Sequence, residues 1–161
     1  MDTPKIYGIK EVKLSILREE PLSAAFKVQS PEEMIPVLET VLKDHPYFTN
    51  EVEQFFVFLL NTRNVVKGWQ LLSTGTLDSV IVHPRDVFKA AIVGNAHSII
   101  IAHNHPSGDP TPSEADIKIT RDLIRAGQLL KIDVTDHIVF APQGTEKMKH
   151  VSLKAMGYFY S

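Results

Sequence analysis

The stretch "HSIIIAHNHPSGDPTPSEAD", residues 97–116, organises the fold around it. Its β-branched run at residues 98–102 predicts a central, buried strand. Two histidines follow, one residue apart. Because side chains at i and i+2 of a strand share a face, we expect His103 and His105 to project together from the carboxyl end of that strand. A loop rich in proline and glycine then leads to the start of a helix near Ser113.

The end of this stretch has two compatible interpretations. Ser113 and Asp116 are spaced as the cap and first turn of an ordinary helix, where a carboxylate favours the helix dipole. The same spacing places them on one helical face, so the loop could bring Asp116 back towards His103 and His105. Three protein ligands with an open fourth position are typical of a catalytic zinc site.

Composition narrows the class of protein. The chain has 161 residues, 43% hydrophobic content and a net charge of -2, which fit a single globular domain. The acidic balance gives little support to nucleic-acid binding. There is no cysteine, so a metal would be held by nitrogen and oxygen ligands, a set that suits Zn²⁺. The N-terminus resembles no signal peptide and no stretch is long enough to span a bilayer, so we expect a cytoplasmic protein.

Hydrophobic periodicity predicts mixed secondary structure along the rest of the chain. Strands are expected at residues 12–16, 53–61, 65–73, 97–103 and 131–140, and helices at 30–46, 84–93 and 113–130. The positions expected on the apolar faces of the three helices are Met34, Val37, Leu38, Val41 and Leu42, then Val87, Phe88, Ala91 and Ile92, then Ile117, Thr120, Leu123 and Ile124. This order predicts an α/β (α+β) fold in which helices pack on one mixed sheet. Residues 1–45 are expected to form an extension packed on the main domain at 46–161.

The polar residues resemble those of a known family. His103-x-His105, seven residues, Ser113, two residues and Asp116 is similar to the JAMM motif of JAB/MPN-type zinc metalloproteins. The wider run at residues 83–116, with "DHIVF" at 136–140, resembles the RadC family (UPF0758). The resemblance implies a single JAB/MPN-like, cytidine-deaminase-like domain with a curved mixed sheet flanked by helices.

The resemblance also implies roles for individual residues. Zinc would be held by His103, His105 and Asp116, and Ser113 would donate a hydrogen bond to the oxyanion. A glutamate on an early strand would act as general base and then as acid towards the leaving amine. We favour Glu53 for that role, with Glu51 as the alternative.

The sequence leaves two roles open for one pair of residues. Asp136 and His137 match the family pattern and either support the site or form a buried polar pair that braces a strand end.

The function favoured is a zinc-dependent hydrolase of peptide or isopeptide bonds, acting on a protein or peptide. The alternative is a factor associated with DNA repair or mobile elements, to which the first 26 residues, without glycine-rich hairpins, give little support. A non-catalytic interaction module ranks lowest because all expected ligands are present. No particular oligomeric state is predicted.

Overall fold

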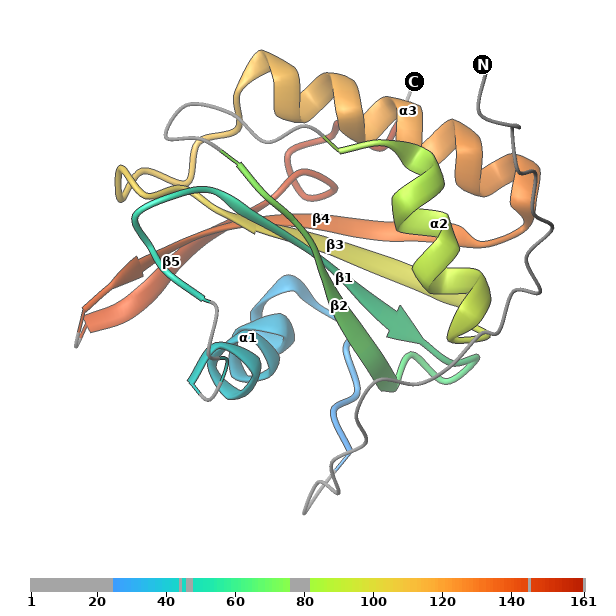
Figure 1. Ribbon diagram of the computed structural model, residues 1–161, viewed down its shortest axis with the longest axis horizontal. Helices are drawn as coiled ribbons and strands as arrows, with labels where there is room; N and C mark the ends of the chain where they lie inside the picture. Colours follow the sequence, from blue (N-terminus) through green and yellow to red (C-terminus); the bar gives the residue numbers. More distant parts are fainter. Residues whose placement is uncertain (1–24, 44, 46–47, 76–81, 145, 161) are drawn as a thin grey trace, which may run out of the picture.

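A five-stranded mixed sheet forms the centre of the molecule (Figure 1). The computed structural model describes residues 25–43, 45, 48–75, 82–144 and 146–160. The strands are β1 (Gln54–Leu60), β2 (Val66–Thr74), β3 (Ser98–Asn104), β4 (Asp133–Gln143) and β5 (Glu146–Ser152), in the order β2-β1-β3-β4-β5. Only the β3–β4 pair is parallel within this sheet. The predicted α/β class is therefore confirmed, and the strand expected at residues 12–16 lies outside the described residues.

Helices cover both faces of the sheet. A short 3-10 turn, Pro31–Glu33, leads into α1 (Met34–Lys43), which packs on one face. The other face is covered by α2 (Pro84–Val93) and α3 (Glu114–Leu130). None of the helices in the described part of the chain is both long and apolar enough to cross a membrane. The two faces are called the α1 face and the α3 face below.

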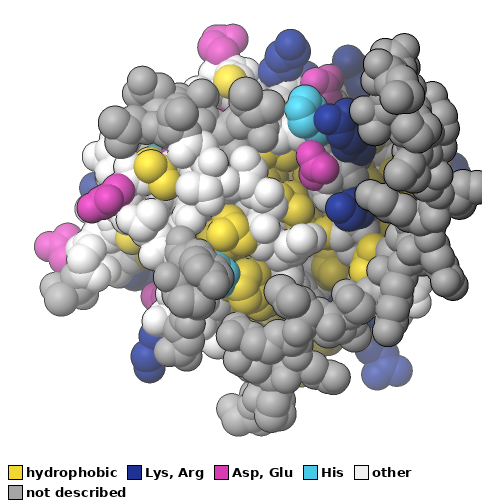
Figure 2. Space-filling view, viewed as in Figure 1, with side chains coloured by type: hydrophobic (Ala, Val, Ile, Leu, Met, Phe, Trp, Pro, Cys, Tyr) yellow, Lys and Arg dark blue, Asp and Glu magenta, His cyan; other side chains and the backbone are white. Residues whose placement is uncertain are grey.

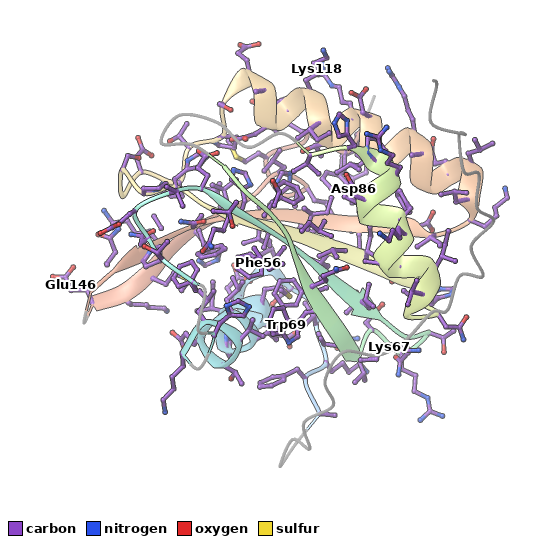
Figure 3. The ribbon with its side chains drawn as sticks, in the orientation of Figure 1. Phe56, Lys67, Trp69, Asp86, Lys118 and Glu146 are labelled. Carbon is purple, nitrogen blue, oxygen red and sulfur yellow. The ribbon has the colours of Figure 1, made fainter. Side chains whose placement is uncertain are left out.

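The central strands are buried on both sides, as their sequences predict. Every residue of β1 and of β3 is buried. Alternation sends Phe56 to the α1 face and Phe55 to the α3 face. Figure 3 shows Phe56 close to Trp69 on the α1 side, where their ring centroids are 6.3 Å apart. Because β3 is packed on both faces, its neighbours fix the position of the strand and of the histidines at its end.

Three details differ from the sequence-based expectation. Strand β5 was not predicted, because its lysine-rich sequence lacks the apolar alternation of a half-buried strand. Ile92 is 55% exposed, whereas Ala90 is buried in its place. On α3, Thr120 and Leu123 are buried as expected, but Ile117 and Ile124 are only half-buried.

A close helix contact explains the orientation of α3. Gly127 is buried, and a Cβ atom built there would lie 2.5 Å from the backbone oxygen of Ile132. Only glycine allows this approach. The helix is thereby turned so that Gly127 and Thr120 face the sheet, with Asp116 on the same side. The apolar spacing alone predicted a buried face that included Ile117 and Ile124 and left out Gly127.

Charged side chains of both signs are interspersed on the surface. In Figure 2, Lys and Arg side chains and Asp and Glu side chains both lie towards the margin, and hydrophobic side chains show through the middle of the view. On this face the described residues form no continuous basic surface of the kind that tracks a phosphate backbone.

Candidate metal centre

The two histidines meet at the carboxyl end of β3, as predicted. His103 is the penultimate residue of the strand and His105 follows its last residue. Their Nε2 atoms are 3.1 Å apart, and both side chains are largely buried. Phe55 lies flat against the His103 ring, with centroids 5.7 Å apart and planes 11° from parallel. The strand and this aromatic contact together set the direction in which the imidazoles point.

Asp116 reaches the same point from the first turn of α3. Its Oδ1 lies 3.2 Å from Nε2 of His103, and its Oδ2 lies 3.1 Å from Nε2 of His105. The capping interpretation holds as well, because Ser113 Oγ accepts from the Asp116 backbone N–H and Asp116 Oδ2 accepts from that of Ser113. One carboxylate thus closes the helix end and faces both imidazoles.

The position before β1 brings Glu53 to the edge of this cluster. Glu53 Oε1 lies 3.8 Å from Nε2 of His105. Glu53, His103 and His105 each offer a potential ligand atom, and these atoms lie within 4.8 Å of one another. Glu51 is exposed on the preceding turn. Of the two glutamates that the sequence offered, the fold directs Glu53 to the histidines.

A metal could be held with either carboxylate, and the distances favour Asp116. Both oxygens of Asp116 lie within 3.2 Å of a histidine Nε2, whereas the Glu53 contact is longer. Glu53 therefore lies at the margin of the cluster.

Asn104, between the histidines, was not singled out from the sequence. Its side chain points away from them and accepts a hydrogen bond from Gln54 N–H at 2.7 Å. It also donates to the backbone oxygen of Val52 at 3.0 Å. Asn104 therefore braces the segment that carries Glu53. Alternation along β3 could have suggested its direction, but its partners lie 50 or more residues away.

The hydrogen bonds of His105 fix which of its nitrogens can bind a metal. Gly108, at φ +87°, turns the loop back so that the backbone oxygen of Asp109 lies 2.9 Å from Nδ1 of His105. A carbonyl only accepts, so Nδ1 carries the hydrogen. In the neutral ring Nε2 then presents a lone pair to the Asp116 carboxylate. Lone pairs that converge in this way repel one another unless a cation lies between them, which is the chemical requirement of a metal site.

The pKa shifts of Asp116 and His105 also indicate that the cluster favours positive charge. Burial by itself raises the pKa of Asp116, but hydrogen bonds from His103 and His105 outweigh it and hold that pKa far below the usual range. Burial lowers the pKa of His105, yet Asp116 and the Asp109 carbonyl raise it to a net value above the ordinary one. The Asp116 carboxylate thus favours a positive charge on or beside His105, which a bound cation would also supply.

Asp136 and His137 lie on opposite faces of the sheet. The Asp136 carboxylate accepts from the hydroxyl of Ser152 at 2.7 Å and from the backbone N–H of Lys154 at 3.3 Å, away from the histidine cluster. Burial raises the pKa of Asp136 despite these bonds. His137 instead faces His103, and burial followed by the neighbouring His103 lowers the pKa of His137 well below the usual value. Of the two interpretations left open, strand bracing fits Asp136 and contact with the site fits His137.

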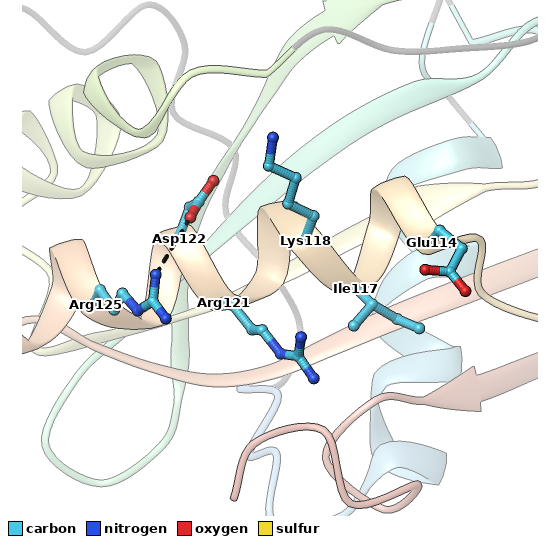
Figure 4. Close-up of a pocket in the computed structure, with 6 residues that line it drawn as sticks. All are labelled: Glu114, Ile117, Lys118, Arg121, Asp122 and Arg125. Atoms are coloured by element: carbon cyan, nitrogen blue, oxygen red, sulfur yellow. Dashed lines mark ion pairs between the residues drawn. The ribbon is translucent and has the colours of Figure 1, made fainter. Parts of the chain in front are cut away.

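The outer side of α3 carries a separate surface pocket. It is lined by Glu114, Ile117, Lys118, Arg121, Asp122 and Arg125 (Figure 4). The helical period places Asp116 and Thr120 on the opposite side, towards the sheet. Within this pocket Arg125 and Asp122 form an ion pair at 4.0 Å, largely in solvent. The pocket and the candidate metal centre therefore lie on opposite sides of α3, and the pocket contains none of the residues of the histidine cluster.

Comparison with known proteins agrees with this architecture. Residues 28–158 match the family model of the RadC-like JAB domain. UPF0758 proteins of Caldanaerobacter subterraneus and Clostridium botulinum (strain Langeland) are each 43% identical, over 83% and 95% of this chain and 53% and 67% of the relatives. A UPF0758 protein of Methanosarcina mazei is 36% identical over 91% of this chain and 58% of the relative. The chain thus spans between about half and two thirds of the length of these proteins. It belongs to the family of RadC-like JAB domains.

Proposed function

We propose that this domain is a zinc-dependent hydrolase that cleaves peptide or isopeptide bonds in a protein or peptide substrate. The observation that supports this most directly is the convergence of the Nε2 atoms of His103 and His105 on the Asp116 carboxylate. Glu53 lies beside this group as a second carboxylate. Two neutral imidazoles and one carboxylate, with a further position open, are a ligand set of catalytic zinc.

Zinc would be held by His103, His105 and Asp116, and when bound it supplies Lewis acidity that makes water nucleophilic near neutral pH and polarises a carbonyl. The other steps belong to the protein. Glu53 accepts the proton of the attacking water and delivers it to the amine that leaves, so the carboxylate is regenerated.

Ser113 would stabilise the negative charge that develops on the carbonyl oxygen of the substrate. Its Oγ accepts a hydrogen bond from the Asp116 backbone N–H, which leaves the hydroxyl hydrogen available for donation. A donor of this kind contributes about 2.7–4 kcal/mol to transition-state stabilisation. Capping and catalysis thus use different parts of one hydroxyl group.

The proposal is tested by Glu53→Gln beside Glu51→Gln, both loaded with zinc. Hydrolysis of a mixed set of fluorogenic peptides and a lysine-branched isopeptide is measured together with metal content. Loss of a general base costs about 10²–10⁴-fold in rate, so we expect that loss in Glu53→Gln with the metal retained. Glu51→Gln should match the wild type. A wild-type protein that binds zinc but cleaves none of these substrates would contradict the proposal, and equal loss in both variants would move the base away from Glu53.

A further inference from the structure

A chain of buried hydrogen bonds connects His103 to the backbone of Asp116 through two residues that have no place in the proposed chemistry. His103 Nδ1 lies 2.8 Å from Nε2 of His137 on β4, and His137 Nδ1 lies 2.6 Å from Oγ1 of Thr120 on α3. Thr120 Oγ1 lies 2.6 Å from the backbone oxygen of Asp116. Thr120 and His137 are 0% exposed. The chain therefore runs from one expected ligand to the residue that carries another.

The direction of every hydrogen in this chain follows from its last link. A backbone carbonyl only accepts, so the single hydroxyl hydrogen of Thr120 is donated to the oxygen of Asp116. Thr120 Oγ1 is then an acceptor towards His137, whose Nδ1 must carry the hydrogen. A neutral His137 has a bare Nε2, which accepts from Nδ1–H of His103. In a neutral His103 ring the remaining nitrogen, Nε2, then directs its lone pair at Asp116 and His105, whereas a ring with hydrogens on both nitrogens donates from Nε2 to the Asp116 carboxylate.

We propose that Thr120 and His137 are positioning residues that hold His103 in the tautomer and orientation needed to bind the metal. The inference rests on the metal site of the proposed function and adds to it the element that orients one ligand. An imidazole in the other tautomer would present N–H to the metal and could not bind it. His137 takes the place that a carboxylate or backbone carbonyl occupies behind many metal-bound histidines.

The surroundings favour an orienting function over simple filling of the core. Phe55 stacks on His103 and meets His137 edge-on, with centroids 5.6 Å apart in the second contact. Phe55 therefore restrains both ring planes through contacts that need no metal. An aliphatic residue at position 137 would pack between the same neighbours but could not accept a hydrogen bond. The polarity of Thr120 and His137, and not only their volume, is therefore what the site requires.

The chain also ties three elements together. His103 is on β3, His137 on β4 and Thr120 on α3, and the last bond ends on the residue whose side chain faces both histidines. A shift of α3 relative to the sheet would break the chain and separate the expected ligands at the same time. Metal affinity should accordingly respond to substitutions at both Thr120 and His137.

The test pairs a disruptive with a conservative variant at each position: Thr120→Val with Thr120→Ser, and His137→Leu with His137→Gln. Serine keeps the hydroxyl, and the glutamine carbonyl can accept from Nδ1–H of His103. Affinities of the full chain for Zn²⁺ and Co²⁺ are measured by competition with a chelator, and the Co²⁺ absorption spectrum reports ligand geometry. Thermal unfolding in excess chelator measures the metal-free fold.

We expect Thr120→Val and His137→Leu to weaken metal binding by about 10–100-fold and to alter the Co²⁺ spectrum. Thr120→Ser and His137→Gln should remain close to the wild type in both. A structural role alone would lower the melting temperature in chelator and leave the affinity of the folded protein unchanged. Wild-type affinity in both disruptive variants would overturn the inference, as would equal weakening in disruptive and conservative variants.

Failure of this inference is distinguishable from failure of the proposed function. If the wild type binds the metal, hydrolyses the substrates and is unaffected by these substitutions, only the positioning role of Thr120 and His137 is wrong. If the affinities change as expected but the wild type cleaves nothing, the positioning role stands and the hydrolase proposal is wrong. A wild-type protein without affinity for either ion overturns both.

Discussion

The two faces of the sheet are built from the same strands but are held together differently. On the α1 face, Phe48, Phe56 and Phe140 form a cluster with ring centroids 6.3 to 6.5 Å apart and tilted planes. On the α3 face, near the ends of β3 and β4, polar atoms of His103, His137 and their partners meet at 2.6 to 3.2 Å. Apolar packing has no preferred direction, whereas each of these polar contacts depends on where one hydrogen lies.

The difference teaches that the polar cluster is confined to one end of the α3 face, whereas apolar packing stabilises the α1 face and the rest of the α3 face. Removal of a buried aromatic side chain costs transfer energy and leaves a cavity, but the rest of the fold relaxes around it. Removal of a polar group on the α3 face leaves a buried partner unsatisfied and a ligand misdirected. We therefore expect substitutions on the α1 face to change the free energy of unfolding, and those around His103 to change metal affinity.

The largest effect is expected from Asp116→Ala, which removes a proposed ligand and the helix cap partner together. The wild type should hold about one zinc per chain, and the variant should lose most of it, beyond the roughly 10–100-fold that loss of an outer partner costs. Elemental analysis after dialysis measures this. Asp122→Ala, on the outer side of the same helix, is the matched control and should keep its zinc. Full zinc content in Asp116→Ala would mean that Glu53 takes its place as the ligand.

Phe56→Ala tests the other face. Phe56 is fully buried, so its truncation should reduce the free energy of unfolding by about 3–5 kcal/mol. Denaturant unfolding measures the loss, and zinc affinity is measured at a temperature at which the variant remains folded. We expect that affinity to match the wild type. A simultaneous drop in zinc affinity would show that the two faces are coupled through the sheet.

A smaller effect should follow from pH. The pKa of His105 is raised in the metal-free fold, so a proton competes with the metal below that pKa. Zinc affinity should fall by about tenfold per pH unit on acidification through it, for one proton displaced. Because the folded pKa exceeds the unfolded one, the stabilising contribution of protonated His105 is complete below about pH 6.5 and is lost as the pH rises through the folded value.

Metal affinity and metal-free stability should therefore change with pH in opposite directions above about pH 6.5. Below that pH the lowered pKa of His137 acts the other way, because the unfolded chain takes up a proton that the buried ring does not. Chelator competition and denaturant unfolding in chelator, across a series of pH values around the usual histidine pKa, measure the two trends. Asp116 adds no slope here because its pKa lies far lower. A flat affinity profile would show that His105 is already neutral in the metal-free protein.

The smallest effect is expected on the outer side of α3. The ion pair between Arg125 and Asp122 is 4.0 Å long, and the Arg125 side chain is 77% exposed. Exposed pairs contribute about 0–1 kcal/mol, so Arg125→Ala should change the free energy of unfolding by less than about 1 kcal/mol and leave zinc content unaltered. A larger change would show that the outer surface of α3 contributes to stability as a buried surface does, although Arg125 is exposed.

The sequence by itself predicted most elements of the sheet and the residues that meet at its end. Strand β3 and the start of α3 are encoded locally, by a β-branched run and by Ser113 three residues before Asp116. Periodicity also predicted that β1 is buried on both faces. Such signals need only neighbours a few residues apart, which is why a single chain displays them. The lysine-rich β5 was missed because an edge strand can be polar on both sides.

Only the tertiary structure decided how these parts meet. It selected Glu53 over Glu51, sent Asp136 and His137 to opposite faces, and set the rotation of α3 through the close contact at Gly127. It also placed Thr120 against His137, 17 residues further along the chain. The local sequence pattern predicts the type of each element, and the sequence gives the side chains that the element carries. The register between strands and the distance of a helix from the sheet depend on packing between distant segments, and these set which lone pairs face one another.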